Sequence, residues 1–161
     1  MKILIAYYSR TGTTKKVGDL LAQKLGFSHE VSVEEIYDTV SRAGAKGYLL
    51  SGRDAMKKRL TKLEAVKFNP AEFDLVIVGT PIWAWTLSVP VRTYLAEQKN
   101  NFKNRVAFFC TMGGSGDEKT FAEMGHIINV SPVATLALKT KEVVSDGFTD
   151  KMEKFLKEFE G

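Results

Sequence analysis

The sequence has little of the residues that mark several specialised classes of protein. Its single cysteine, Cys110, excludes an internal disulfide framework and fits a reducing compartment. Two histidines and one cysteine are a poor ligand set for zinc, so we expect no metal. No apolar run approaches the roughly 20 residues that a membrane span requires, and the run ILIA after Lys2 is too short for a signal-peptide core. We therefore expect a soluble, cytoplasmic protein that does not insert into membranes.

The sequence also lacks a strong excess of charge. It holds 23 Lys or Arg and 19 Asp or Glu, a net charge of +4. The basic run Lys57–Arg59 is interpreted as a solvated helix face rather than a nucleic-acid patch, so no nucleic-acid partner is expected. With 161 residues, 44% of them hydrophobic, and only 4 prolines, the chain fits one domain over residues 1–161.

What is present is an alternation of strand and helix patterns. The expected strands are Lys2–Tyr8, His29–Val33, Phe73–Gly79, Arg105–Thr111 and Val133–Leu138. The expected helices are Thr14–Leu25, one that starts at a capping Ser88, Phe121–Ile128, and one over Thr149–Phe159 with Thr149 as its cap. The segment Tyr37–Val66 mixes glycines with helical patterns and is left unassigned. Strands alternating with helices predict an α/β fold: a three-layer, doubly wound, five-stranded parallel sheet.

Ligands of such sheets bind beyond the carboxyl ends of the strands, where this chain has three unusual loops. The first loop, Ser9–Thr14, combines hydroxyl groups with Gly12 and leads into a helix, whose N-terminus presents free amides and the positive end of its dipole. It lacks the glycine patterns of nucleoside triphosphate and dinucleotide sites, so a monophosphate fits better. The alternative is that the hydroxyl groups merely cap the helix.

The second loop, Thr80–Thr86, contains two tryptophans above a buried strand. An indole exposed to water is unusual unless a ligand covers it, and a flat aromatic ligand would do so. If the chain stays extended, Trp83 and Trp85 point to opposite sides, so only one of them meets the ligand. The alternative is that both rings pack against the domain's own helices.

The third loop, Cys110–Asp117, has three glycines in four residues, which brings bare amides close to the edge of a bound ring. The alternative is a flexible turn. A cysteine phosphatase loop is excluded, because such a loop needs an arginine seven positions after Cys110 and Asp117 stands there. Cys110 is therefore expected to be a half-buried structural thiol.

A phosphate cradle, an aromatic platform and an amide-lined edge together match the anatomy of flavin mononucleotide (FMN). The stretches YYSRTGTTKK, GTPIWAWTLSVPV and FFCTMGGSG resemble loops of the flavodoxin family, and the resemblance covers essentially the whole chain. It implies strand order 2-1-3-4-5, noncovalent FMN, and electron transfer in which the cofactor carries the chemistry and no catalytic residue is needed. The expected cofactor-binding residues are Ser9, Arg10, Thr11, Gly12, Thr13, Thr14, Thr80, Pro81, Ile82, Trp83, Ala84, Trp85, Thr111, Met112, Gly113, Gly114 and Gly116.

The chain departs from the family pattern in two ways. Many flavodoxins have a glycine in the second loop whose peptide rotates to bond the half-reduced flavin, but residues 81–87 contain none, and Ala84 is the only small candidate. Reaching a positive φ there on reduction would cost about 1–2 kcal/mol. Classical carrier flavodoxins are also strongly acidic, whereas this chain is basic, so its partners are expected to differ.

Three functions remain open from the sequence. The first is an electron carrier between redox proteins, and the second is an FMN-dependent oxidoreductase that passes hydride from a nicotinamide to a quinone. The third is a flavin-free interaction domain of the same fold. A reductive titration of the flavin-loaded protein would separate the first two.

Overall fold

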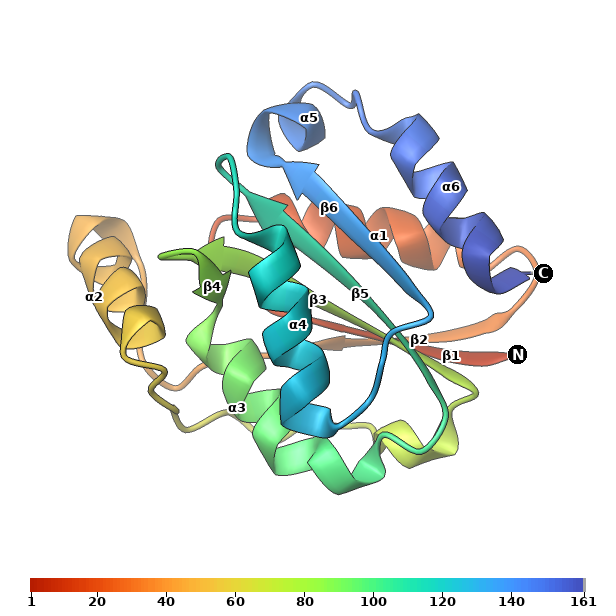
Figure 1. Ribbon diagram of the computed structural model, residues 1–161, viewed down its shortest axis with the longest axis horizontal. Coiled ribbons are helices and arrows are strands. Elements are labelled where there is room, and N and C mark those ends of the chain that lie inside the picture. Colours follow the sequence, from red (N-terminus) through yellow and green to blue (C-terminus); the bar gives the residue numbers. More distant parts are fainter. Residues whose placement is uncertain (161) are drawn as a thin grey trace.

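The computed structural model describes residues 1–160, which are arranged around a parallel sheet (Figure 1). The strands of the sheet are β1 (Lys2–Tyr7), β2 (Glu30–Glu35), β3 (Leu75–Trp83), β5 (Arg105–Met112) and β6 (Ala134–Lys139). They are paired in parallel in the order β2-β1-β3-β5-β6. This is the predicted 2-1-3-4-5 order, because β4 (Thr86–Leu87) is an additional short strand that pairs antiparallel with β3.

Helices cover both faces of the sheet and complete the predicted three layers (Figure 1). They are α1 (Thr13–Leu25), α2 (Gly44–Met56), α3 (Val89–Gln98), α4 (Asp117–Ile128), α5 (Thr140–Val144) and α6 (Thr149–Glu160), with 3-10 turns at Pro70–Glu72 and Lys99–Asn101. Helices α1 and α6 pack on one face, and α3 and α4 pack on the other.

The position of strand β1 in the sheet explains why its sequence is almost entirely apolar. Ile3 and Ile5 belong to the core beneath α1 and α6, whereas Leu4 and Ala6 belong to the core beneath α3 and α4. A strand buried on both faces needs apolar residues at every position. The continuous apolar run is therefore explained by helices on both sides of the sheet.

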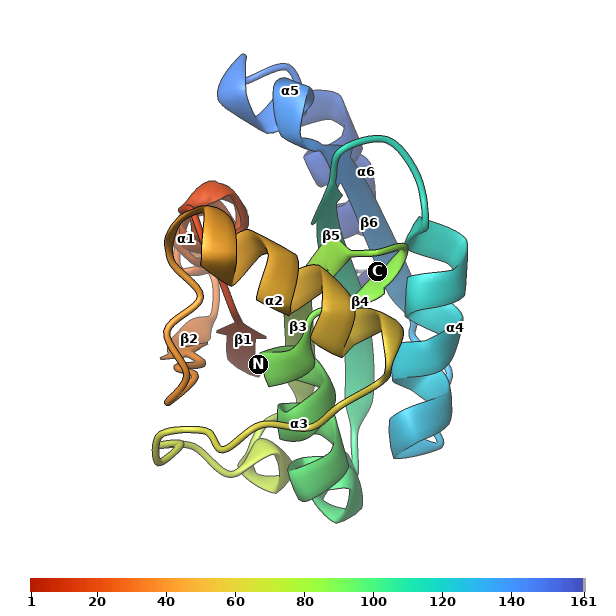
Figure 2. The same cartoon turned by 90° about the vertical axis from the view of Figure 1, so that its left-hand side faces the viewer.

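Helix α2 does not cover a face of the sheet but lies beyond the carboxyl ends of the strands, on the side opposite the two termini (Figure 1; the orange helix in front in Figure 2). Its buried positions are occupied by small or polar residues: Gly47, Ser51, Asp54 and Ala55. The helix lies within the segment Tyr37–Val66 that the sequence left unassigned, since such a face has no apolar stripe to reveal it.

Several local expectations need correction. Thr149 is the first residue of α6 rather than its cap, and Ser88 stands at the start of α3 but bonds the Thr80 hydroxyl instead of capping the helix. The run Lys57–Arg59 is exposed but follows the end of α2, so it is not on a helix face. Cys110, expected to be half-buried, is fully buried because it lies on β5, an interior strand between β3 and β6. Over residues 1–160, no helix combines the length and the apolar character that crossing a membrane requires.

Candidate functional site

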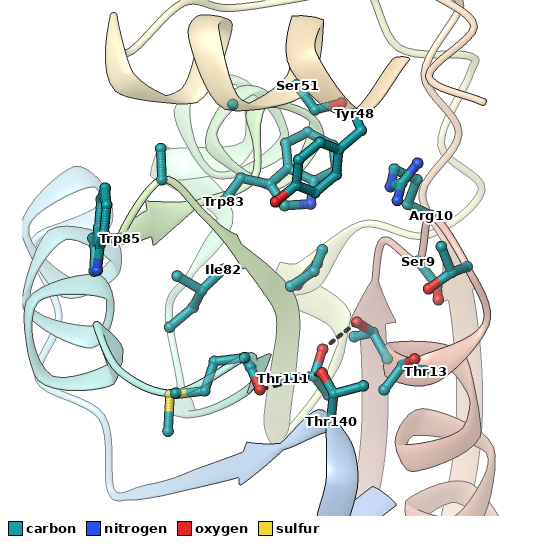
Figure 3. A pocket seen from close by; sticks show the side chains of 18 of the residues that line it. Ser9, Arg10, Thr13, Tyr48, Ser51, Ile82, Trp83, Trp85, Thr111 and Thr140 are labelled. Carbon is teal, nitrogen blue, oxygen red and sulfur yellow. Dashed lines mark hydrogen bonds between the residues drawn. The ribbon is translucent and has the colours of Figure 1, made fainter. Parts of the chain in front are cut away.

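A cavity of about 690 Å³ lies at the carboxyl ends of the strands, within the roughly 300–1,000 Å³ typical of small-molecule sites (Figure 3). It is lined by all three loops that the sequence singled out and by α2. Of the residues expected to contact the cofactor, Gly12, Thr80 and Gly116 do not line it, and all the others do. The structure thus brings together loops that are separated by about a hundred residues along the chain.

The first loop is shaped by a glycine in a left-handed conformation. Gly12 stands at the start of α1 with φ of 94°, and its amide donates a hydrogen bond to Ser9 Oγ at 3.0 Å. A residue with a side chain rarely adopts this φ, which explains the glycine. Thr11 and Thr13 line the cavity at the N-terminus of α1, where the helix dipole favours negative charge.

Thr14 connects the first loop to the third. It is buried, and its hydroxyl oxygen lies 2.8 Å from that of Thr111, to which it is hydrogen-bonded (Figure 3). The pairing fixes the position of the start of α1 relative to the end of β5. Thr14 is therefore an internal support as well as a lining residue.

The second loop is a tight hairpin between β3 and β4. Trp83 pairs with Thr86, which leaves Ala84 and Trp85 as the two-residue turn, with φ of 47° and 61°. Positive φ at both central residues is the mark of a type I′ turn, whose twist matches that of the flanking strands. The expectation that Ala84 reaches a positive φ only on reduction is wrong, because the hairpin already imposes that conformation.

The two tryptophans have different surroundings. Trp83 packs edge-to-face with Tyr8 at 5.5 Å, and the guanidinium carbon of Arg42 lies 5.5 Å from its ring centroid. Trp85 is exposed and points away from Trp83, on the other side of Ile82 (Figure 3). Trp83 thus packs partly against the protein itself, but on two loop residues rather than on the helices that the alternative interpretation named, and Trp85 stays exposed.

Arg42 is held against Trp83 by buried ion pairs. Its Nε lies 2.6 Å from an Asp38 carboxylate oxygen, and its Nη1 lies 3.3 Å from Asp54 on α2. Cation–π contacts of this kind are strongest when both groups are desolvated. Arg42 therefore couples the aromatic wall of the cavity to α2.

The third loop and Thr80 support the hairpin. Gly113 and Gly114 are exposed, with open space around them. Gly116 starts α4 with φ of 109°, and a side chain there would lie 3.2 Å from the Trp85 Cα, so the hairpin packs directly on this glycine. The buried Thr80 hydroxyl accepts a hydrogen bond from the Ser88 amide at 3.0 Å, at the base of the hairpin.

Sequence reasoning missed the wall that α2 contributes. The lining residues it did not identify are Tyr48, Leu49, Ser51, Gly52, Arg53, Met56, Ser115 and Thr140. The available signal was three large apolar side chains, Tyr48, Leu49 and Met56, in a helix whose buried face is too small and polar to need them. The Arg10 guanidinium, 5.5 Å from the Tyr48 ring centroid, joins this wall to the first loop.

A second ionic cluster joins the end of α2 to the hairpin. Glu123 on α4 pairs with Lys58 at 2.6 Å and Arg92 at 2.9 Å, and it accepts a hydrogen bond from Thr86 of β4. Burial alone would raise the pKa of this carboxyl, but the hydrogen bonds from Lys58, Thr86 and Arg92 lower it to about 2. Glu123 is therefore ionised whenever the protein is folded at neutral pH.

The structure provides little reactive chemistry of its own near the cavity. Burial, and next the Asp117 carboxylate, raise the pKa of the Cys110 thiol to about 12, so the thiol stays protonated. Among the side chains of residues 1–159, no group of three or more His, Cys, Asp or Glu is arranged to hold a metal ion. The arrangement can bind and orient a phosphorylated aromatic ligand.

The order of the strands, the helices on both faces and a cavity built from three strand-end loops define a flavodoxin-like α/β protein. The chain belongs to the flavodoxin family, whose model matches residues 2–151. No curated protein matches the chain closely enough in sequence to count as a relative.

Solved structures share this fold at low sequence identity. A flavoprotein from Lactobacillus acidophilus in complex with FMN is 20% identical over 89% of this chain and 97% of its own, with a TM-score of 0.69. The oxidised flavodoxin 2 from Bacillus cereus is 22% identical over 96% of this chain and 100% of its own, with a TM-score of 0.55. A flavodoxin variant from Pseudomonas aeruginosa is 15% identical over the full length of both chains, with a TM-score of 0.62.

Proposed function

We propose that the protein binds FMN noncovalently and transfers electrons between redox partners. The observation that carries the proposal is the single cavity into which the hydroxyl-rich loop, the tryptophan hairpin and the glycine loop all open. When bound, FMN supplies the redox chemistry. The protein supplies binding, orientation and exclusion of water.

The residues of the cavity fit this ligand. Thr11, Thr13 and the N-terminus of α1 provide hydroxyl donors and a positive dipole end for a phosphate group. Ile82 and Trp83 form an apolar wall for an aromatic ring, and the exposed Gly113–Gly114 backbone leaves room for polar atoms at a ring edge. Both the phosphate and the ring therefore have complementary surroundings.

A titration of the purified protein with FMN tests the proposal. We expect quenching of FMN fluorescence with a dissociation constant in the micromolar range or below, and weaker binding of riboflavin, which lacks the phosphate. A protein that leaves FMN fluorescence unchanged at micromolar concentrations would support the flavin-free interaction domain instead.

One observation favours a second candidate, an FMN-dependent oxidoreductase that reduces a quinone with a nicotinamide donor. The side chains of Tyr48, Leu49 and Met56 extend the cavity with apolar surface on the α2 side, where a small second substrate would find contacts. Anaerobic mixing of the flavin-loaded protein with NADPH or NADH distinguishes the two. Rapid bleaching of the flavin absorbance supports the oxidoreductase, and its absence supports the carrier.

A further inference from the structure

The positive charge of the molecule is concentrated in the segment that contains α2. Residues 42–62 carry seven Lys or Arg and one Asp, a net charge of +6, whereas the whole chain is +4. The rest of the chain therefore has a net charge of −2. The basic residues of the segment are Arg42, Lys46, Arg53, Lys57, Lys58, Arg59 and Lys62.

Part of this charge is neutralised within the protein and part is left for a partner. Arg42 is buried between Asp38 and Asp54, and Lys58 pairs with Glu123. Arg53 and Arg59 share the one carboxylate of Asp54 and are about half exposed. The ammonium groups of Lys46, Lys57 and Lys62 form no ion pair with the side chains of residues 1–159, and all three residues are exposed.

The same segment, together with Trp85 of the hairpin, exposes several large apolar side chains. The exposed fractions are 66% for Tyr48, 72% for Leu49, 65% for Met56, 60% for Leu60 and 66% for Trp85. Tyr48, Leu49, Met56 and Trp85 also line the mouth of the cavity, so they are gathered in one place. Clustered apolar residues with a polar rim are the usual composition of a protein–protein interface, in which Tyr, Trp and Met are enriched. We call these five residues with Lys46, Arg53, Lys57 and Lys62 the α2 surface.

We propose that the α2 surface is the docking site for an acidic protein, which it brings to the mouth of the cavity. The inference rests on the proposed electron-transfer function, because that function gives docking at the cavity its role. The charge complementarity itself does not depend on that function. The positive rim is complementary to an acidic partner, and it opposes a second copy of this chain, which would present the same +6 segment. Family members that carry a strong acidic charge would attract basic partners. In this chain, the basic segment 42–62 instead favours acidic partners.

Two charge-reversal variants test whether the charge of segment 42–62, rather than the net charge of the protein, directs binding of the acidic partner. The first changes Lys46→Glu, Lys57→Glu and Lys62→Glu. The matched control changes Lys99→Glu, Lys103→Glu and Lys157→Glu, exposed lysines on the 3-10 turn Lys99–Asn101, the loop before β5 and the last turn of α6. Both variants have the same net charge of −2, because each loses six charges from +4. Neither variant alters a residue that lines the cavity.

The probes are an acidic plant-type ferredoxin and the basic mitochondrial cytochrome c. Association with the flavin-loaded protein is measured by stopped flow at low and high ionic strength. We expect the unmodified protein to bind ferredoxin faster at low salt than at high salt, and faster than it binds cytochrome c. At low salt, the association rate of the α2 variant with ferredoxin should be lower by about tenfold or more, a factor within the range that electrostatic steering supplies. The control variant should lose less than about threefold, since its lysines lie on elements outside the 42–62 segment and its net charge equals that of the α2 variant.

Backbone NMR of the protein as purified, with or without flavin, provides the second measurement. Ferredoxin should perturb residues within 42–62 and around Trp85. This readout does not depend on electron transfer, so it separates failure of the docking proposal from failure of the FMN proposal. Equal losses in the two variants, a preference for cytochrome c, or perturbations at another surface would each overturn the proposal. Perturbations of the α2 surface that depend on the protein's own concentration would overturn it as well, since the occupant would then be a second copy.

Discussion

At the scale of single residues, the hairpin turn is the least ordinary feature of the site. Ala84 and Trp85 both have positive φ, a conformation that side chains disfavour by roughly 1–2 kcal/mol, and a type I′ turn is normally built from Asn and Gly. Strand pairing of β3 with β4 and packing on Gly116 hold the turn in place. The cost of the conformation is therefore present before any change in redox state.

This strain predicts that Ala84→Gly stabilises the protein. We expect the free energy of unfolding, measured by urea denaturation, to rise by up to about 1 kcal/mol, because glycine adopts the turn without steric cost. The matched control is Ala122→Gly in α4, an exposed helical position, which should instead lower it by about 1 kcal/mol. A decrease in both variants would show that the turn stores no strain.

The hydroxyl groups of the first loop lead to a second prediction at this scale. Changing Thr11→Ala together with Thr13→Ala should weaken FMN binding by about 1.5–3 kcal/mol for each charge-assisted hydrogen bond lost, and should leave riboflavin binding nearly unchanged. Fluorescence titration with both ligands measures the difference. Ser28→Ala with Ser131→Ala, at exposed positions outside the cavity, is the control. Equal losses of affinity for FMN and riboflavin would contradict the proposal that this loop binds the phosphate group.

At the scale of elements, α2 is held by ion pairs near its C-terminal end rather than by an apolar stripe. Asp54, in the last turn, pairs with Arg42, which precedes the helix, and Lys58, just past the end, pairs with Glu123 of α4. The side chains that face the cavity are thereby left uncovered. The helix can present Tyr48, Leu49 and Met56 because its attachment does not require them.

The Glu123 cluster predicts a specific dependence of stability on pH. Its pKa is about 2 in the folded protein against a usual value of 4.5, so its contribution is complete above pH 4.5 and is lost as the pH falls towards 2. The difference corresponds to roughly 3 kcal/mol. Glu123→Gln should therefore be less stable than the unmodified protein at pH 7 by up to about 3 kcal/mol, with the gap closing by pH 2 to 3.

Denaturation with urea at several pH values measures this gap. Glu118→Gln, an exposed position on the same helix, serves as the control and should change stability by less than about 0.5 kcal/mol. A constant difference between Glu123→Gln and the unmodified protein from pH 7 to pH 2 would contradict the role of the ion pairs.

At the scale of the whole molecule, the cavity joins loops that follow three different strands. A ligand that contacts all three stabilises the folded state only, by about 2.7 kcal/mol when its concentration is 100 times its dissociation constant. For a chain of this length, that corresponds to a rise in melting temperature of roughly 5–10 °C. Thermal unfolding with and without FMN measures the shift, and adenosine monophosphate, which has a phosphate but no flavin ring, is the control ligand.

Much of the fold and part of the site could be predicted from the sequence because the responsible interactions are local. Burial of β1, β3 and β5 can be predicted from their continuous apolar runs. Burial of one face of α1 can be predicted from the helical spacing of Val17, Leu21 and Leu25. The Ser9–Thr14 loop shows its chemistry through residue type and its position before a helix. Periodicity and turn composition are properties of a short stretch of chain, so they are visible without the rest of the molecule.

Only the tertiary structure decided the wall formed by α2, the contact of Arg42 with Trp83 and the left-handed turn at Ala84. Each depends on partners distant in sequence: Asp54 and Trp83 for Arg42, Glu123 for Lys58, and Gly116 for the hairpin. The sequence by itself determined that a hydroxyl-rich loop, an aromatic loop and a glycine loop meet at one edge of the sheet. Which side chains close that edge, and which stay exposed to solvent, followed from tertiary ion pairs that no local pattern encodes.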